Sequence, residues 1–406
     1  MKVFLPELFP SIISKFPRKQ FLISRFVFLG NGFRTSLANV FSLCYDAFRQ
    51  PVLAMDIREI AKRAKVSTAT VSRAINRIPT VDPQLAKRVW KVVDELGYYP
   101  NTQARALVSG KSRILGLVVS EITNPFFPEI VQTFEELAVQ NDYEILLTST
   151  VHDTKRMKSS VRRMIERRVD GVAILTFGME EALLDDLRLR KVPLVFVDVG
   201  PDAPHVSNIR IDYQHGLRQA VQHLAAFRHK TIAFVAGPTH LKSALARKEA
   251  FEKAMGELSL EVAPEMIVVG DHTLEGGMRA LEELMRLRKP PTAVLCSNDM
   301  TAIGVMREAY DLGLSVPRDL SVVGFDDIRL SEFITPPLTT VQMSQTELAR
   351  IAFEALMNEV AEETAAGGRR EYHLNTNLIL RRSTALAASG PMRAKISADR
   401  SISLTS

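Results

Sequence analysis

The chain has few of the residues that build disulfide-rich or membrane proteins. Its 406 residues include two cysteines, Cys44 and Cys296, and one tryptophan. Two cysteines are too few for a disulfide framework or a cysteine-based zinc site, so a reducing cytoplasm is the expected compartment. No uncharged apolar run approaches the roughly 18 residues that span a bilayer. We therefore expect no membrane partner.

Signatures of catalysis are also missing. The sequence has no Gly-rich phosphate loop ending in Lys-Ser/Thr, no paired Cys or His at metal-binding spacing and no Gly-x-Ser-x-Gly turn. The Ser-Asn-Asp triplet at 297–299 is not accompanied by a Ser-x-x-Lys nucleophile on a suitable helix. The sequence therefore predicts no enzyme activity, no cofactor and no metal site.

What is present first is a block of three short helical patterns at 55–101. Apolar residues at i, i+3, i+4 and i+7 predict a first helix from Ile57, and a sharp turn follows near Ser67. The third helix starts behind Asp82 and a proline, and it ends at Gly97. Three helices with a tight first turn indicate a helix-turn-helix.

The second helix of this block, 68–76, is predicted to present a polar face. Only Val71, Ala74 and Ile75 point inward, so short hydrogen-bonding side chains and one guanidinium face outward, as a helix in a DNA groove requires. The alternative is a small helical bundle with a polar second helix. The residues predicted to contact DNA here are Ser67, Thr68, Ala69, Thr70, Ser72, Arg73 and Asn76.

Charge is distributed unevenly along the chain. Residues 55–113 hold twelve Lys or Arg against five acids, a net charge of +7, whereas 114–406 carries −6 and 1–54 carries +5. A basic small segment joined to an acidic larger one points to a phosphate-binding part on a body that avoids DNA.

Several motifs in order resemble one family. They are VSTATVSRAIN (66–76), ELGYYPN (95–101), ARALVSGKSRILGLVV (104–119), NPFF (124–127), RRVDGVAIL (167–175), SNDMTAIGVMR (297–307), SVVGFDD (321–327) and PPLTTV (336–341). Together they are similar to the lactose-repressor (LacI/GalR) family of bacterial transcription regulators over about 55–383. The resemblance implies a helix-turn-helix, a hinge, and a core like a periplasmic sugar-binding protein with three crossovers between two lobes.

From Ile114 onward the pattern alternates strands with helices. Four short β-branched runs occur at 114–120, 143–149, 170–176 and 193–199, and four more at 231–237, 265–270, 292–297 and 321–325. Runs that are apolar throughout indicate strands buried on both faces, hence parallel sheets. Two such sets imply two α/β lobes, and the resemblance implies that they form a periplasmic-binding-protein-like core. The expected fold class is an α helix-turn-helix head plus an α/β two-lobed periplasmic-binding-protein-like core with parallel sheets.

Ligands of open parallel sheets bind beyond the carboxyl ends of the strands. Asn298 and Asp326 follow two such strands and can grip vicinal hydroxyls, although helix capping also explains one member of each pair, Asn298-Asp299 and Asp326-Asp327. Asp198 ends another strand. By resemblance Arg247 reaches the ligand, the alternative being a surface arginine, and Asn298 and Asp326 are the ligand-side members of their pairs.

Two ring-bearing residues complete the predicted effector site. His272 occupies a position where many relatives place an aromatic that stacks on a sugar ring; it either stacks or is a solvated loop histidine. Phe127 in the NPFF motif supplies an apolar wall, unless Phe126 and Phe127 are core anchors.

The connecting and terminal segments lack sheet patterns. Residues 101–113 resemble the family's hinge, with Ala104 and Leu107 at the minor groove, where an apolar wedge kinks DNA; a plain linker is the alternative. Residues 1–54 are interpreted as a mis-called start or a disordered extension, because the resemblance starts at Met55, with an amphipathic membrane anchor as the rival. The tail, 384–406, lacks a leucine heptad.

Together these observations predict a cytoplasmic homodimeric repressor. Its partners are double-stranded operator DNA and a small effector, a sugar or sugar derivative. The predicted domains are the helix-turn-helix at 55–100, the hinge at 101–113 and the two-lobed domain at 114–383. The main alternative is a sugar-binding receptor that does not bind DNA.

Overall fold

The computed structural model describes residues 57–98 and 110–388, except 77, 79, 152, 177–184, 188, 199–204 and 362–369. The chain divides into two compact units, one up to Pro100 and one from Asn101 onward. The predictions for 1–54, for Ala104 and Leu107 and for the tail beyond 388 lie outside the described residues. None of the helices in the described part is long and apolar enough to cross a membrane.

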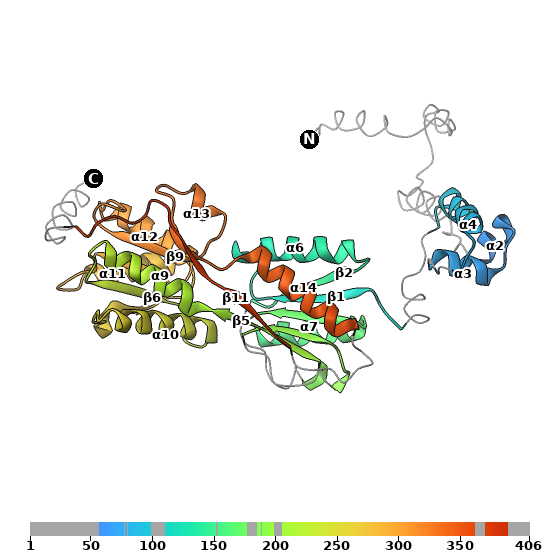
Figure 1. Ribbon diagram of the computed structural model, residues 1–406, viewed down its shortest axis with the longest axis horizontal. Helices are drawn as coiled ribbons and strands as arrows, with labels where there is room; N and C mark the ends of the chain where they lie inside the picture. The colour runs from blue at the N-terminus through green and yellow to red at the C-terminus, as the bar shows by residue number, and fades with distance from the viewer. Residues whose placement is uncertain are drawn as a thin grey trace, which may run out of the picture. The chain divides into compact units, whose positions relative to one another are not determined.

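The N-terminal unit is the predicted three-helix arrangement (Figure 1). Its helices are α2 (Ile57–Ala64), α3 (Thr68–Ile75) and α4 (Pro83–Leu96). Ile60, Val71 and Val89 are fully buried at its centre. The Asp82 carboxylate caps α4 by accepting from the backbone N–H groups of the second and third residues after it, at 2.9 and 3.1 Å. The expected helix-turn-helix is confirmed.

The second unit contains two α/β lobes, each with a six-stranded sheet. The first-lobe sheet has the order β11-β5-β4-β3-β1-β2, and all its pairings are parallel. Its strands are β1 (Ile114–Val119), β2 (Glu144–Ser149), β3 (Gly171–Leu175), β4 (Leu194–Val197), β5 (Val206–Asp212) and β11 (Arg370–Asn375). The helices of this lobe are α6 (Phe126–Gln140), α7 (Thr154–Glu166) and α14 (Gln345–Ala361).

The second-lobe sheet has the order β12-β10-β9-β8-β6-β7, parallel except for the antiparallel edge strand β12. Its strands are β6 (Ile232–Ala236), β7 (Ile267–Val269), β8 (Ala293–Cys296), β9 (Ser321–Asp326), β10 (Thr339–Gln342) and β12 (Asn377–Ile379). The helices of this lobe are α9 (Tyr213–Ala226), α10 (Lys242–Glu257), α11 (Leu274–Met285), α12 (Asp299–Asp311) and the short α13 (Leu330–Phe333).

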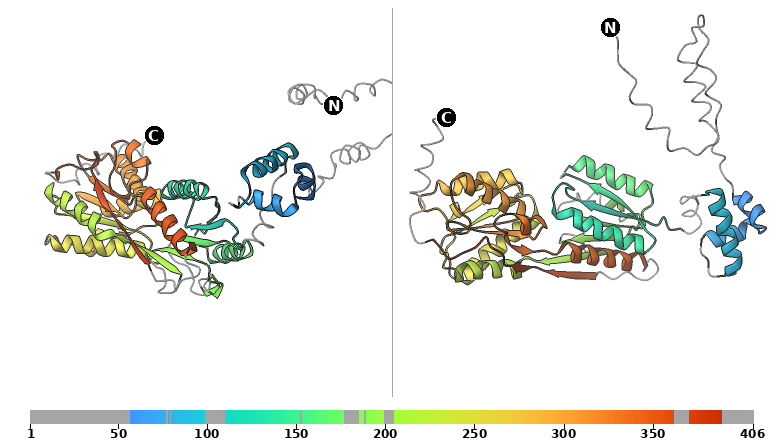
Figure 2. Two further views of the ribbon diagram at one scale, coloured as in Figure 1. Left: turned by 45° about the vertical axis from the view of Figure 1, so that its right-hand side comes forward. Right: turned by 90° about the horizontal axis from the view of Figure 1, so that it is seen from above.

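Three chain crossings join the lobes. The chain leaves the first lobe between β5 and α9, returns between β10 and α14, and crosses again at Thr376 between β11 and β12. Figure 1 shows β5 and β11 side by side at the junction, and Figure 2 shows the two lobes from two further sides. One apolar cluster continues through both lobes, from Leu115 on β1 to Phe325 on β9. Separate clusters fill the α7 face of the first lobe and the α11 and α12 face of the second.

The sequence pattern located eight strands and missed four: β5, β10, β11 and β12. The residues of β11 alternate between exposed or half-exposed positions, and only Leu374 is buried. An edge strand with a solvated face lacks the continuous apolar run used to recognise buried strands. For the same reason β2, at the opposite edge, is less buried than its sequence suggested.

Candidate nucleic-acid interface and ligand cavity

The predicted DNA-contacting residues of the N-terminal unit lie on one face of α3 and its two caps. Ser67, Thr68, Ala69, Arg73 and Asn76 are exposed, and Thr70 and Ser72 are half-buried. The opposite face is buried in the helical core, as expected from its apolar residues. The structure therefore brings all seven predicted positions together.

Local hydrogen bonds organise this face. The Ser67 Oγ accepts from the Thr70 backbone N–H at 3.1 Å and lies 2.9 Å from the Thr70 hydroxyl. Asn76 ends the helix as its C-cap, and its amide lies 3.5 Å from the Ser72 hydroxyl. The helix is one residue shorter than predicted. The Asn76 backbone N–H still donates to the Ser72 backbone oxygen at 3.0 Å, but the ψ of Asn76 is 7°, outside the helical range. Short donors and acceptors beside the Arg73 guanidinium are the groups that read base edges in a major groove.

Exposed cations flank this face on the preceding helix. Lys62 and Arg63 lie on α2, and Arg63 forms an ion pair with Glu59 one turn away at 2.9 Å. Exposed pairs of this kind contribute little to stability. Such side chains remain able to contact phosphate, which positions a protein on DNA without reading its sequence.

A cavity of about 200 Å³ lies between the two lobes of the second unit and is called the interlobe cavity here. Five of the six predicted effector residues line it, and these are Phe127, Arg247, His272, Asn298 and Asp326. Phe127 comes from the first lobe and the other four from the second. The remaining lining residues are Ser120, Glu121, Asn124, Phe126, Pro238, His240, Leu241, Ser243, Asp271 and Thr273.

Arg247 is held rigidly in the wall of the interlobe cavity. Its side chain is 5% exposed, and its guanidinium lies 4.1 Å from the ring centroid of Phe325 and donates to the backbone oxygen of Ser297. The guanidinium also lies 5.4 Å from the ring centroid of Tyr213. A guanidinium held against aromatic faces loses little freedom on binding. This burial excludes the alternative of an ordinary surface arginine.

Asp326 faces the guanidinium of Arg247. The carboxylate Oδ1 lies 3.3 Å from Nη2 of Arg247, a distance for an ion pair without hydrogen-bond alignment. Within the described residues, this Oδ1 and the Nε of Arg247 are buried without hydrogen-bond partners. Burial raises the pKa of Asp326 to about 6, partly offset by Arg247. Two buried groups with unused bonding capacity are suited to a polar ligand.

We expected one member of the pair Asn298-Asp299 to cap a helix and Asn298 to be the ligand-side member; in the structure Asn298 both caps α12 and lines the interlobe cavity. Asn298 caps α12, accepting from the Thr301 backbone N–H at 2.9 Å, yet it also lines the interlobe cavity and donates to the backbone oxygen of His272. Asp299 is fully buried and accepts from the hydroxyls of Ser331 and Thr340 and from a backbone N–H. Burial, and then the neighbouring Asp326, raise the pKa of Asp299 to about 8.

The second acidic pair shows that the capping alternative was wrong for its members. Neither Asp326 nor Asp327 caps a helix, because the N-cap of α13 is Arg329. Asp327 instead forms an ion pair with Arg381 at 2.7 Å. The two carboxylates thus have different partners, and the backbone φ is positive at both positions, 109° at Asp326 and 57° at Asp327.

Both predicted residues that carry a ring, His272 and Phe127, line the interlobe cavity. His272 is half-buried, with a left-handed backbone (φ 64°), and lines the interlobe cavity. It is therefore not simply a solvated loop histidine. Phe126 and Phe127 each are 5% exposed, meet edge to face with centroids 5.2 Å apart, and belong to the core while lining the interlobe cavity. They anchor the core and form the apolar wall at once.

Asp198 alone among the six does not line the interlobe cavity. Its carboxylate accepts from the Tyr213 hydroxyl at 2.6 Å and from the Ile211 backbone N–H at 2.9 Å. Burial raises the pKa of Asp198, although these hydrogen bonds act in the opposite direction. Asp198 thus fixes Tyr213, whose ring lies beneath Arg247.

Several lining residues were not predicted, although a signal for some of them existed. Ser120, Pro238 and Asp271 come shortly after β1, β6 and β7, so the rule that ligands bind beyond strand ends would have found them. Tyr213, which contacts Arg247 but is not among the lining residues, follows β5, a strand that the sequence pattern missed.

Comparisons with known proteins agree with this architecture. Residues 56–101 match the model of bacterial regulatory proteins of the lacI family, and 221–384 match the periplasmic binding protein-like domain. The HTH-type transcriptional repressor PurR of Aliivibrio salmonicida is 32% identical over 328 residues, covering 80% of this chain and 98% of the relative.

Two solved structures are similar in fold. A lac repressor dimer bound to operator and the anti-inducer ONPF has a TM-score of 0.72 and 27% identity, covering 82% of this chain and 99% of that one. A LacI family transcriptional regulator from Enterococcus faecium with bound ribose has a TM-score of 0.60 and 26% identity, covering 67% and 99%. The chain therefore belongs to the LacI family of bacterial transcription regulators, with a helix-turn-helix and a periplasmic-binding-protein-like domain.

Proposed function

We propose that this protein is a transcriptional repressor whose affinity for operator DNA is set by a small carbohydrate-like effector in the interlobe cavity. The observation that carries the effector assignment is the buried pair Arg247 and Asp326. The pair lines a cavity walled by aromatic rings and includes one donor and one acceptor without hydrogen-bond partners among the described residues. A guanidinium and a carboxylate bind neighbouring hydroxyls through paired hydrogen bonds, and an aromatic ring packs against the apolar face of a sugar.

The size of the interlobe cavity favours a single-ring effector. About 200 Å³ is less than the roughly 300–1,000 Å³ of sites for drug-sized ligands. The relative from Enterococcus faecium holds ribose, a one-ring sugar. A planar base would satisfy the aromatic wall but uses fewer hydroxyl-type hydrogen bonds, so a monosaccharide or its derivative is the preferred class.

Coupling between the effector and DNA follows from the three crossings. An effector held by Phe127 on one side and Arg247 on the other draws the lobes together, and the crossings transmit that change to the first lobe. An effector shifts operator affinity only as far as its own affinity differs between the two lobe arrangements. The segment 101–113, which includes Ala104 and Leu107, connects this lobe to the helix-turn-helix and is proposed to act as the hinge.

The proposed assembly is a homodimer that works in the cytoplasm, where bacterial operators are found. A twofold dimer places two copies of α3 on half-sites about one helical turn apart, so the operator is expected to be near-palindromic. The lac repressor structure similar to this chain is a dimer on its operator.

The DNA-reading role of α3 is tested by operator selection. Replacing Thr68→Tyr together with Ala69→Gln changes two exposed positions and leaves the buried face of α3 intact. The double variant should select a different half-site from random duplexes. An unchanged preferred half-site would refute the assignment of base reading to this face.

A matched variant separates base reading from phosphate contact. Lys62→Gln removes an exposed cation from α2 without touching α3. Loss of one phosphate contact should lower the salt slope of operator binding by about one unit and leave sequence preference unchanged. A change of preferred sequence in this variant would contradict the division of roles.

The effector class is tested by a thermal-shift screen of the full chain. The panel contains ribose, glucose, sugar acids and the purine bases adenine and guanine. A monosaccharide or its acid should raise the Tm and change operator affinity, because a ligand of the folded state stabilises it. Stabilisation by a purine alone would replace the carbohydrate proposal. A ligand that binds without altering operator affinity would favour the alternative of a sugar-binding receptor.

A further inference from the structure

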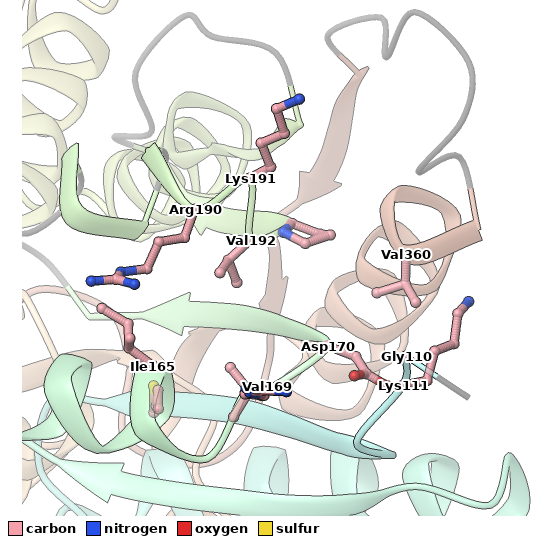
Figure 3. A pocket seen from close by; sticks show the side chains of 12 residues that line it. Gly110, Lys111, Ile165, Val169, Asp170, Arg190, Lys191, Val192 and Val360 are labelled. Atoms are coloured by element: carbon pink, nitrogen blue, oxygen red, sulfur yellow. The ribbon is translucent and has the colours of Figure 1, made fainter. Parts of the chain in front are cut away.

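A second cavity lies at the opposite end of the first-lobe sheet from the interlobe cavity. It has a volume of about 290 Å³ and is called the basal cavity here. It is formed where α7, the segment 190–193 and α14 approach the amino ends of β1, β3 and β4, whereas the interlobe cavity includes residues beyond the carboxyl end of β1. Figure 3 shows its lining.

The basal cavity combines a cationic rim with an apolar floor. Its lining carries four cations, Lys111, Arg168, Arg190 and Lys191, and among the described lining residues Asp170 is the only acid. In the view of Figure 3, valine side chains lie between Arg190 on one side and Lys111 on the other. The apolar lining residues are Met164, Ile165, Val169, Val192, Pro193 and Val360.

The single acid is committed to the protein itself. Asp170 Oδ1 accepts from the backbone N–H of Ser112 at 2.7 Å and from its hydroxyl at 3.0 Å, and Oδ2 accepts from the backbone N–H of Arg113 at 3.0 Å. These hydrogen bonds hold the Asp170 carboxylate against the chain that enters β1. The lining still contains more cations than acids, and this positive charge favours an anion.

Two of the four cations occupy backbone positions that disfavour their side chains. Arg168 and Lys191 are left-handed, with φ of 52° and 54°, and each lies at a turn between a helical segment and a strand. Glycine or asparagine is the usual residue at such a position, because a larger side chain costs free energy there. A cation at a helix end also offsets the carbonyl dipoles. The helix dipole alone does not explain why two cations in left-handed positions line the same cavity beside an apolar floor.

From the charge, the floor and these two strained positions we infer that the basal cavity binds a small organic phosphate. The exposed side chains of Arg168, Arg190 and Lys191, of which Figure 3 shows Arg190 and Lys191 extending in different directions, turn toward the phosphate when it binds, and the organic part packs on Val169 and Val192. The inference is independent of the proposed effector site, because the two cavities share no lining residue. No covalent step is involved.

The test uses the full chain with two probes, inorganic phosphate and phenyl phosphate, in calorimetric titrations. Both should bind saturably, and phenyl phosphate should bind more tightly because its ring buries apolar surface in the floor. The double variant Arg168→Gly/Lys191→Gly should bind both probes at least about tenfold more weakly, since two cationic partners are lost. The same variant should have a higher Tm, because glycine relieves the left-handed backbone.

Two control variants locate the effect. Arg228→Gly removes an exposed arginine with φ 65° after α9, outside the basal cavity, so it should also raise the Tm but leave phosphate affinity unchanged. Arg247→Ala alters the interlobe cavity and should leave phosphate affinity unchanged as well.

Three results would overturn the inference. They are absence of saturable phosphate binding, unchanged affinity in the double variant, and loss of phosphate binding in Arg247→Ala. A DNA backbone is the other source of phosphate. If the double variant lowers the salt slope of duplex binding while neither small probe binds, the rim contacts DNA and the small-phosphate assignment is wrong.

Discussion

The two lobes share a strand order yet contribute different chemistry to the cavity between them. Each sheet places its strands in the same spatial sequence around a central parallel core. The first lobe supplies the rings of Phe126 and Phe127, and the second supplies the buried charges of Arg247 and Asp326. The fold therefore does not determine the chemistry; the residues that follow each strand do.

Helix packing differs between the lobes as well. In the first lobe α6 meets α14 through Phe134 and Phe353, edge to face with centroids 5.5 Å apart. In the second lobe α11 meets α12 so closely that a Cβ on Gly277 would lie 2.1 Å from the backbone oxygen of Thr301. The α6–α14 interface depends on large side chains, whereas the α11–α12 interface depends on the absence of a side chain at Gly277.

The largest expected loss of stability comes from the first-lobe interface. Phe134 is fully buried, so Phe134→Ala removes an aromatic ring and leaves a cavity in the core. The free energy of unfolding should fall by about 4 kcal/mol. Urea unfolding followed by circular dichroism measures it. A loss below about 1 kcal/mol would show that α6 and α14 do not depend on this contact.

The α11–α12 interface of the second lobe should be destabilised by adding a side chain, not by removing one. Gly277→Ala adds one methyl against backbone that has no room to move, and should lower the free energy of unfolding by about 2 to 3 kcal/mol. Gly256→Ala is the control, since nothing lies within 4 Å of its Cβ position on α10. It should be neutral or slightly stabilising. Equal effects of the two substitutions would remove the distinction between the interfaces.

The buried acid of the second lobe predicts a pH dependence of stability. The pKa of Asp299 is raised to about 8, so the folded protein retains a proton that the unfolded chain releases near pH 4. Stability should therefore fall as pH rises from about 4 to about 8, by at most about 1.4 kcal/mol per pH unit, and then level.

Asp299→Asn removes the titrating carboxyl group and so isolates its contribution to the pH dependence of stability. An amide can keep the same partners. Its oxygen accepts from the Ile328 backbone N–H and the Ser331 hydroxyl, and its NH₂ donates to the Thr340 hydroxyl, which reverses the bond that Thr340 donates to the carboxylate of the parent chain. The difference in Tm between the variant and the parent chain should change steadily in favour of the variant from pH 6 to pH 8. A constant difference would mean that the carboxyl is already ionised in the folded protein.

A smaller pH effect is expected on effector binding. Asp326, with a pKa of about 6, accepts hydroxyl hydrogen bonds best when ionised, so affinity for the strongest sugar hit should fall as pH drops from 7 to 5. The decrease should not exceed about tenfold per pH unit. Asp326→Asn should bind weakly with a flat pH profile. A decrease that persists in this variant would show that the pH effect does not arise from the Asp326 carboxylate.

The sequence predicted the elements with strong local signals and missed those defined by distant neighbours. The three helices of the N-terminal unit and eight buried strands have apolar periods that are visible locally. The strand β11 is polar and pairs with β5, more than 150 residues earlier, so only the folded sheet explains it.

The same limit applies to the cavity. The pairs Asn298-Asp299 and Asp326-Asp327 were found from their position after predicted strands, and the family resemblance selected Asn298 and Asp326 within them. The support of Arg247 by Tyr213 and of Tyr213 by Asp198 spans three separate segments, and no local pattern reveals it.

Calorimetry on Arg247→Ala and Asp326→Ala tests most directly whether the second lobe supplies the polar contacts to the effector. The strongest hit of the thermal-shift screen is titrated into each variant, with operator binding measured in parallel. Removing one member of a buried charged pair typically costs about 2–5 kcal/mol, so effector affinity should fall well over tenfold. Operator binding without effector should be retained, because α3 lies in the other unit. Effector affinity close to that of the parent chain in both variants would contradict the account.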